Sequence, residues 1–219
     1  MIRSQLKELS VEEFANTITH GFGLVLSLAG FVVLLMMAIT RGEPLLVVGS
    51  AIYGLSLIIL YTASTVYHGT TSLELKEKLR LVDHCCIYLL IAGSYTPFGL
   101  ILLNGTRGQA LLAGIWTFAI AGIAAKLVWQ HRFPGISVAS YVVMGWLGIF
   151  AIGPLFELLG SPAIILTVAG GLAYTFGVIF FAWERLRHHH AIFHLFVLAG
   201  SILHYAAVVL YVIPHTVGQ

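Results

Sequence analysis

The sequence predicts an all-α, polytopic membrane protein, a bundle of seven transmembrane helices forming one domain over residues 1–219. Hydrophobic residues make up 59% of the chain, whereas charged residues make up only 9%. Soluble domains carry about 25% charged residues, so this composition excludes an ordinary soluble fold. The mean hydropathy of +0.97 leads to the same conclusion.

Seven separate apolar runs supply the predicted helices. A helix needs about 20 apolar residues to cross a hydrocarbon core of about 30 Å, and each run is close to that length. In chain order, the runs cover residues 18–39, 45–67, 81–103, 110–129, 137–156, 162–183 and 191–212.

The segments between the runs explain where each helix is expected to begin and end. The first run follows a polar, amphipathic segment, Met1–Glu13, without the small-residue cleavage site of a signal peptide, so the first helix is expected to remain in the mature protein. Residues 69–80 form a polar surface segment between the second and third runs. The remaining connections are short and contain glycine, proline and charged residues, which end helices and favour turns.

The distribution of lysine and arginine predicts the orientation, because positively charged loops close to helix ends stay in the cytoplasm. Of the 11 basic residues, only Arg41 and Arg107 fall on the side opposite to the amino terminus. The others are Arg3, Lys7, Lys76, Lys78, Arg80, Lys126, Arg132, Arg185 and Arg187. The amino terminus is therefore predicted inside, and the tail from Pro214 to Gln219 outside.

Two histidine patterns predict a metal site at the cytoplasmic end of the bundle. His68 closes the second predicted helix, and His190 and His194 open the seventh, so all three lie at the same depth. Residues four apart share one helix face, which lets His190 and His194 bind one ion together. A histidine buried in a membrane needs a partner, and neutral imidazole is a common zinc ligand. We therefore predict a zinc ion bound by these three residues.

Two polar residues near these ligands suggest catalysis. Zinc with three protein ligands keeps a fourth position for water, as in catalytic sites. Asp83 opens the third helix at the same depth and could accept a proton or orient that water. Ser64, one turn below His68, could hydrogen-bond the water or a substrate carbonyl. Cys85 and Cys86 are adjacent and cannot form an ordinary disulfide, and thiolate ligation is not expected.

Other histidines allow simpler interpretations. For His188 and His189, a polar spacer and a functional role are equally supported, because histidine runs are common in loops. His84 points about 100° away from Asp83 on a helix and is better explained as a packing residue. His204 lies about 15 Å deeper than His194, so it cannot share the ion. A structural helix cap is the alternative for His190 and His194 themselves.

Ahead of the first apolar run, Glu13, Asn16 and His20 are spaced three and four residues apart, on one helix face. This spacing alone fits a cluster that supports the metal site and a solvated helix start equally well.

Several motifs in order make the chain resemble the bacterial hemolysin III proteins, which are similar to the progestin and adipoQ receptors, including the adiponectin receptors. The resemblance covers the chain from Glu13 to Tyr211. The motifs that carry it are Glu13-Phe-Ala-Asn16, Thr19-His20-Gly21, Ser64-x-x-x-His68, Asp83-His84-Cys85-Cys86-Ile87-Tyr88, Ala92-Gly93-Ser94-Tyr95-Thr96-Pro97-Phe98 and His190-Ala-Ile-Phe-His194.

This resemblance implies a seven-helix bundle with an inside amino terminus, in a bacterial inner (plasma) membrane. It also implies zinc ligation by the histidines matching His68, His190 and His194, with Asp83 and Ser64 beside the ion. It favours the supporting role for Glu13, Asn16 and His20, which the spacing left open. The wider superfamily includes the alkaline ceramidases, which hydrolyse a lipid amide, and this is the basis for expecting a hydrolase.

Three functions follow as hypotheses. The first is a zinc-dependent membrane hydrolase of a lipid amide or ester, with a membrane lipid as substrate or ligand. The second is a sensor or regulator of membrane state, in which zinc is structural. The third, a pore-forming cytolysin, ranks last because the apolar runs contain no charged lining for an ion pathway. The net charge of +2 gives no reason to expect nucleic acid as a partner, and protein partners stay open.

Overall fold

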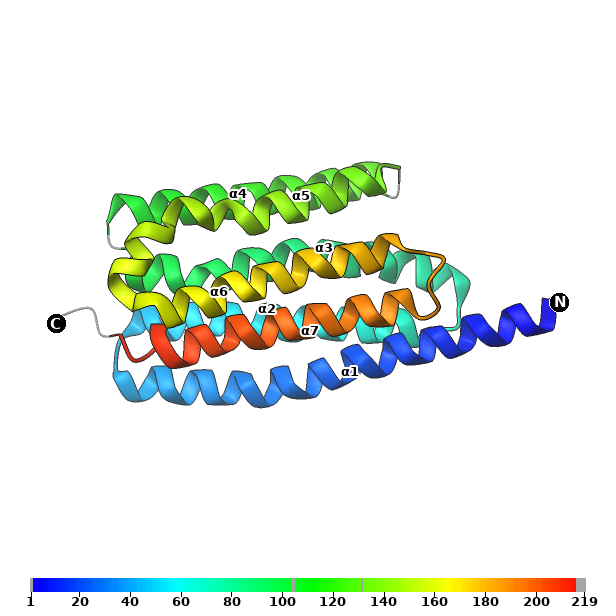
Figure 1. Ribbon diagram of the computed structural model, residues 1–219, viewed down its shortest axis with the longest axis horizontal. Helices are drawn as coiled ribbons and strands as arrows, with labels where there is room; N and C mark the ends of the chain where they lie inside the picture. Colours follow the sequence, from blue (N-terminus) through cyan, green and yellow to red (C-terminus); the bar gives the residue numbers. More distant parts are fainter. Residues whose placement is uncertain (1, 104, 131, 216–219) are drawn as a thin grey trace.

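The computed structural model describes residues 2–103, 105–130 and 132–215, and the side chains from Val11 onward within those ranges. The side chains of Arg3 and Lys7 and the last four residues of the predicted outside tail therefore lie outside the described part. Within it, every regular element is helical (Figure 1). The α-helices are α1 (Ile2–Arg41), α2 (Pro44–Gly69), α3 (Leu73–Pro97), α4 (Thr106–Trp129), α5 (Pro134–Trp146), α6 (Ile152–Ala182) and α7 (His189–Ala207).

Three short helical segments complete these elements. The π-helical turns η1 (Phe98–Leu102) and η3 (Val208–Val212) continue α3 and α7, and the 3₁₀ turn η2 (Leu147–Ala151) joins α5 to α6. Six helical segments among the described residues are long and apolar enough to cross a membrane. They are Val11–Arg41, Pro44–Gly69, Leu73–Leu102, Thr106–Trp129, Pro134–Ala182 and His189–Val212.

The segment Pro134–Ala182 contains two of the predicted runs, 137–156 and 162–183. Gly160 interrupts it with φ 73° and ψ 178°, a backbone conformation that glycine adopts without a steric penalty. Pro162 follows two residues later and cannot donate a backbone hydrogen bond. Figure 1 shows the chain reversing its direction between α5 and the later part of α6.

Two segments expected to be polar surface are helical. Residues 2–17 continue α1 ahead of its apolar part, and Figure 1 shows this end extending past the other helices. Residues 73–80 form the first two turns of α3, which Ser72 caps by accepting a hydrogen bond from the Leu75 amide at 3.5 Å. A polar segment is not expected to cross the hydrocarbon core, but it can continue a transmembrane helix into the surrounding water.

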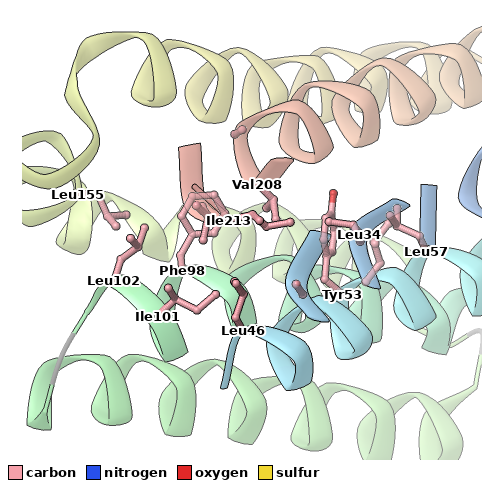
Figure 2. Close-up of a cluster of buried hydrophobic side chains, with 14 of the residues drawn as sticks. Leu34, Leu46, Tyr53, Leu57, Phe98, Ile101, Leu102, Leu155, Val208 and Ile213 are labelled. Carbon is pink, nitrogen blue, oxygen red and sulfur yellow. The ribbon is translucent and has the colours of Figure 1, made fainter. Parts of the chain in front are cut away.

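The main hydrophobic core extends from the middle of the bundle to the end opposite to the start of α1 (Figure 1), and Figure 2 shows part of it. Leu34 of α1, Tyr53 of α2, Phe98 of η1 and Val208 of η3 are buried there. A smaller cluster, which contains Tyr88, joins α3 to α4 and α5. Many apolar side chains point outward instead, and the chain contacts lipid through them rather than through polar groups.

We expect Gly108→Ala to destabilise the protein, because α4 approaches η1 and the residue that follows it closely at this position. An added Cβ would collide with the carbonyl oxygens of Gly99 and Leu103, and backbone atoms cannot move aside as a side-chain tip can. Overpacking of this kind costs about 1–3 kcal/mol, which a thermal unfolding curve in detergent would detect. Gly114→Ala is the control on the same helix, since its Cβ would meet no atom within 4 Å. Equal midpoints for the two variants would contradict the prediction.

Candidate metal centre

Three histidines meet where α2 ends and α7 begins. His68 comes from the last turn of α2, and His190 and His194 come from the first two turns of α7. One nitrogen from each ring can be chosen so that all three lie within 4.8 Å of one another. Metal–nitrogen distances of about 2.0–2.1 Å keep two ligands of one ion within about 4.2 Å of each other, so only small movements of the rings are needed to bind one ion. The structure therefore brings together the three predicted ligands, and this group could hold a metal ion.

Hydrogen bonds from α1 orient two of the three rings. The Nδ1 atom of His68 lies 2.8 Å from the Glu13 carboxylate, to which it donates when Nδ1 carries the proton. The Nδ1 atom of His194 lies 3.3 Å from the main-chain oxygen of Asn16 and 3.2 Å from the Thr19 hydroxyl. Metal-binding histidines commonly use one ring nitrogen in this way, which leaves the other for the ion.

The Nε2 atom of His68 fits this pattern. It is buried and has no hydrogen-bond partner among the described residues, although buried polar atoms are normally paired. His68 is 4% exposed and His194 only 1%, so water cannot readily replace the absent partner. A metal ion would satisfy this nitrogen, and the donor set of three imidazoles suits zinc.

The three residues that the resemblance assigned to a supporting role lie on α1 beside these rings. Glu13 bonds His68, while Asn16 lies between two ligands, with its amide nitrogen 3.4 Å from His68 Nδ1 and its main-chain oxygen near His194. His20 stacks on His194, with ring centroids 3.5 Å apart and an angle of 13° between the planes. The solvated alternative does not describe Asn16 and His20, which are buried.

Ser64 connects the α1 residues to Asp83. The Ser64 hydroxyl lies 2.6 Å from His20 Nδ1 and is close enough to the Asp83 carboxyl group to interact with it. Both residues are buried, at 1% and 9% exposed. Asp83 does not belong to the group of mutually close ligand atoms, which contains only the three histidines. The aspartate therefore lies near Ser64, which contacts His20, and His20 in turn stacks on the candidate ligand His194.

The remaining histidines have other contacts. His204 donates from Nε2 to the Thr167 main-chain oxygen at 3.0 Å, deep in the bundle. The His189 ring contacts the Phe180 main-chain oxygen at 3.1 Å, and His188 precedes α7 with a positive φ of 57°. The His84 ring lies 2.7 Å from the Arg80 main-chain oxygen, but also 3.6 Å from Asp83, closer than its helical position suggested.

Two neighbours of the ligands were missed by the sequence reasoning. Thr19 was considered only as part of a motif, yet its hydroxyl contacts His194. Lys76 was used only to orient the chain, but its ammonium group lies 2.9 Å from Glu13 and donates to the main-chain oxygens of Tyr67, His68 and Thr70 at 3.3–3.4 Å. The sequence signal for this contact is the position of Lys76, eight residues after His68 at the end of α2, because lysine often caps the last carbonyls of a helix.

Comparison with known proteins shows the family to which the chain is similar. The family model described as haemolysin-III related matches residues 10–205. Hemolysin-3 of Bacillus cereus is 44% identical over 211 residues, which cover 96% of each chain, and a Hemolysin-3 homolog of Bacillus subtilis is 42% identical over 200 residues, 91% of this chain and 94% of the other. The human monocyte to macrophage differentiation factor is 28% identical over 221 residues, covering 92% of this chain and 85% of its own.

The apolar helices and the family matches both indicate where the protein is located. It is a multi-pass membrane protein, and the expected location in a bacterial plasma membrane is consistent with the two Bacillus relatives. The resemblance predicted from separated motifs is confirmed over nearly the whole chain. This chain belongs to the haemolysin-III related family.

Proposed function

We propose that this protein is a zinc-dependent membrane hydrolase that cleaves an amide or ester bond of a membrane lipid. The observation that carries the proposal is the arrangement of three buried or half-buried histidines beside a buried aspartate and serine. A structural zinc site is normally closed by four protein ligands, whereas three ligands leave a position open. Among the described residues, the group of close ligand atoms contains three histidines and no fourth member.

The proposal includes seven membrane crossings with the amino terminus in the cytoplasm. A straight helix over Pro134–Ala182 would be about 74 Å long at about 1.5 Å per residue, more than twice the thickness of a hydrocarbon core. A break at Gly160 divides it into two crossings of ordinary length. The start of α1 and the end of η3 lie at opposite ends of the bundle in Figure 1, which supports an odd number of crossings. The basic residues then place the histidines near the cytoplasmic face.

Zinc bound by the histidines would act as a Lewis acid that polarises a substrate carbonyl and activates water. Asp83 is suited to accept the proton of the attacking water, because its carboxylate is buried and lies close to Ser64. The Ser64 hydroxyl orients His20 through a hydrogen bond of 2.6 Å. Glu13 and Asn16 orient the rings of His68 and His194 through Nδ1, which leaves the second ring nitrogen of each for the ion.

The test is to purify the protein in detergent, measure its zinc content by elemental analysis, and follow hydrolysis of lipid amides and esters by mass spectrometry. The proposal expects about one zinc per chain and product formation that stops when a chelator removes the metal and resumes when zinc is restored. Turnover that continues unchanged in the zinc-free protein would overturn it.

We expect Glu13→Gln to weaken zinc binding without removing it. The neutral amide can still accept a hydrogen bond from His68, but it loses the negative charge that makes the imidazole a better donor and that pairs with Lys76. Replacing a group that orients a ligand typically costs about 10–100-fold in metal affinity, measurable by competition with a zinc-binding dye. Glu74→Gln is the control, since Glu74 is exposed and pairs with Lys78. Equal zinc affinities of the two variants would count against an orienting role for Glu13.

A second candidate function is a non-catalytic sensor or regulator of membrane state in which zinc ties α2 to α7. The observation that favours it is the origin of the ligands, which come from two helices far apart in the sequence and so would cross-link them. In this case zinc removal would lower the unfolding midpoint while no lipid is cleaved. The pore-forming activity suggested by the relatives' printed name stays the last candidate, because the apolar runs of the sequence lack the rows of charged residues that line ion pathways.

A further inference from the structure

A pocket between α3, α4 and α5 contains a buried cation that the proposed hydrolase does not use. Its volume is about 390 Å³, within the range of about 300–1,000 Å³ typical of ligand sites. Apolar and aromatic side chains form most of its wall, among them Phe118, Trp129, Phe133 and Ile136. The last three are at least half exposed, so the rim of the pocket faces the surroundings of the helices.

Lys126 is the charged residue in this lining. Its side chain is turned inward, because the residue is only 4% exposed, whereas a lysine at a helix end usually extends its ammonium group into interfacial water. The ammonium donates one hydrogen bond, to the Ser137 hydroxyl at 3.1 Å. None of the ion pairs formed by the described residues includes Lys126. Two of its three N–H donors thus remain for an anion.

The side chains around Lys126 do not neutralise the positive charge of its ammonium group. Cys85 and Arg80 both lie close enough to act on Lys126 electrostatically. The Cys85 thiol is mostly neutral at about pH 7, whereas Arg80 has the same sign as Lys126 and is itself paired with Glu77 at 2.8 Å. A charge buried among apolar groups is costly unless it has a partner of opposite sign. The serine and tyrosine hydroxyls nearby are neutral, and Tyr88 and Ser140 are already bonded to each other at 2.7 Å. The missing partner is an anion.

The position of the pocket in the bundle indicates the source of that anion. The end of α4 and the start of α5 lie at the same end of the bundle as the start of α7 (Figure 1), and the apolar segments Thr106–Trp129 and Pro134–Ala182 end and begin there. The rings of Trp129 and Phe133 contact each other edge to face, with their centroids 6.3 Å apart. Tryptophan is enriched at the level of the lipid head groups. Basic pockets between transmembrane helices at this depth bind anionic head groups.

We propose that this pocket binds an anionic phospholipid of the surrounding bilayer. The phosphate pairs with the Lys126 ammonium group, and an acyl chain lies along Phe118 and Ile136. A folded partner protein is a poorer occupant, because a recessed ammonium that is 4% exposed can be reached by a small head group more easily than by a carboxylate on a protein surface. The site is separate from the metal centre, since none of the three histidines lines it.

The test is a titration of the full-length protein in non-ionic detergent with dioleoyl phosphatidylglycerol or dioleoyl phosphatidylcholine, with the first bound lipid quantified by native mass spectrometry. One lysine near a head group favours the anionic lipid by about fivefold, so wild type should bind phosphatidylglycerol at least that much more tightly. Lys126→Met should abolish this preference and leave phosphatidylcholine binding unchanged. Lys78→Met is the matched control, because Lys78 is 70% exposed, pairs with Glu74 and does not line the pocket.

A second variant keeps the test decisive if Lys126→Met fails to fold. Ala121→Phe fills the pocket from an exposed position in its wall and retains the lysine, so it should weaken phosphatidylglycerol binding at least fivefold. The proposal is overturned if Lys126→Met keeps the wild-type preference, if Ala121→Phe binds phosphatidylglycerol as tightly as wild type does, if Lys78→Met loses the preference as fully as Lys126→Met, or if oleate binds wild type in place of phosphatidylglycerol.

Discussion

His194→Ala is expected to lose zinc and turnover together. His194 is the most buried of the three ligands, at 1% exposed, and it is also the ring on which His20 stacks. Without it, two imidazoles and solvent cannot close a stable site, because structural and catalytic zinc sites both require at least three protein ligands. His68→Ala and His190→Ala should have the same effect, since all three nitrogens belong to one group.

The measurement is elemental analysis of purified wild type and variants after removal of loosely bound metal. Wild type should contain about one zinc per chain, and each ligand variant should contain close to none. His204→Gln is the matched control: it removes a histidine from the same helix, but one whose ring donates to Thr167 rather than facing the metal centre. A His194→Ala protein that retains full zinc and full activity would refute both the site and the mechanism.

Asp83→Asn is expected to keep zinc and lose most of the catalytic rate. The amide has nearly the same shape as the carboxylate and can still form hydrogen bonds, but it cannot accept a proton from water. General base catalysis contributes about 10²–10⁴-fold, and the loss should appear in kcat with little change in zinc content. The residue thus separates the two leading functions, since a purely structural zinc site does not require Asp83.

The control for this experiment is Glu77→Gln, which neutralises an exposed carboxylate on the same helix, 64% exposed and paired with Arg80. Its zinc content and rate should match those of wild type. A structural role of zinc becomes the better explanation if Asp83→Asn keeps the wild-type rate. The same holds if neither wild type nor Asp83→Asn cleaves any lipid amide or ester while zinc stabilises both.

The sequence alone determines the class of the fold and the pairing of the histidines. Both depend on local properties: a run of apolar residues long enough for the bilayer, and a spacing of four that places His190 and His194 on one face. The depth of His68 follows from the same reasoning, because a residue at the end of an apolar run lies near the membrane surface. These predictions need no knowledge of how the helices pack, and the family comparison confirms the membrane class.

Only the tertiary structure decided how the helices meet around the site. Contacts of Lys76 with Glu13 and of Thr19 with His194 join residues far apart in the chain, and no pattern in either segment specifies its partner. The inward turn of Lys126 likewise depends on the placement of α5 against α4. Hydropathy places a residue along the membrane normal, but the rotation of each helix and its lateral neighbours follow from side-chain packing over the whole bundle.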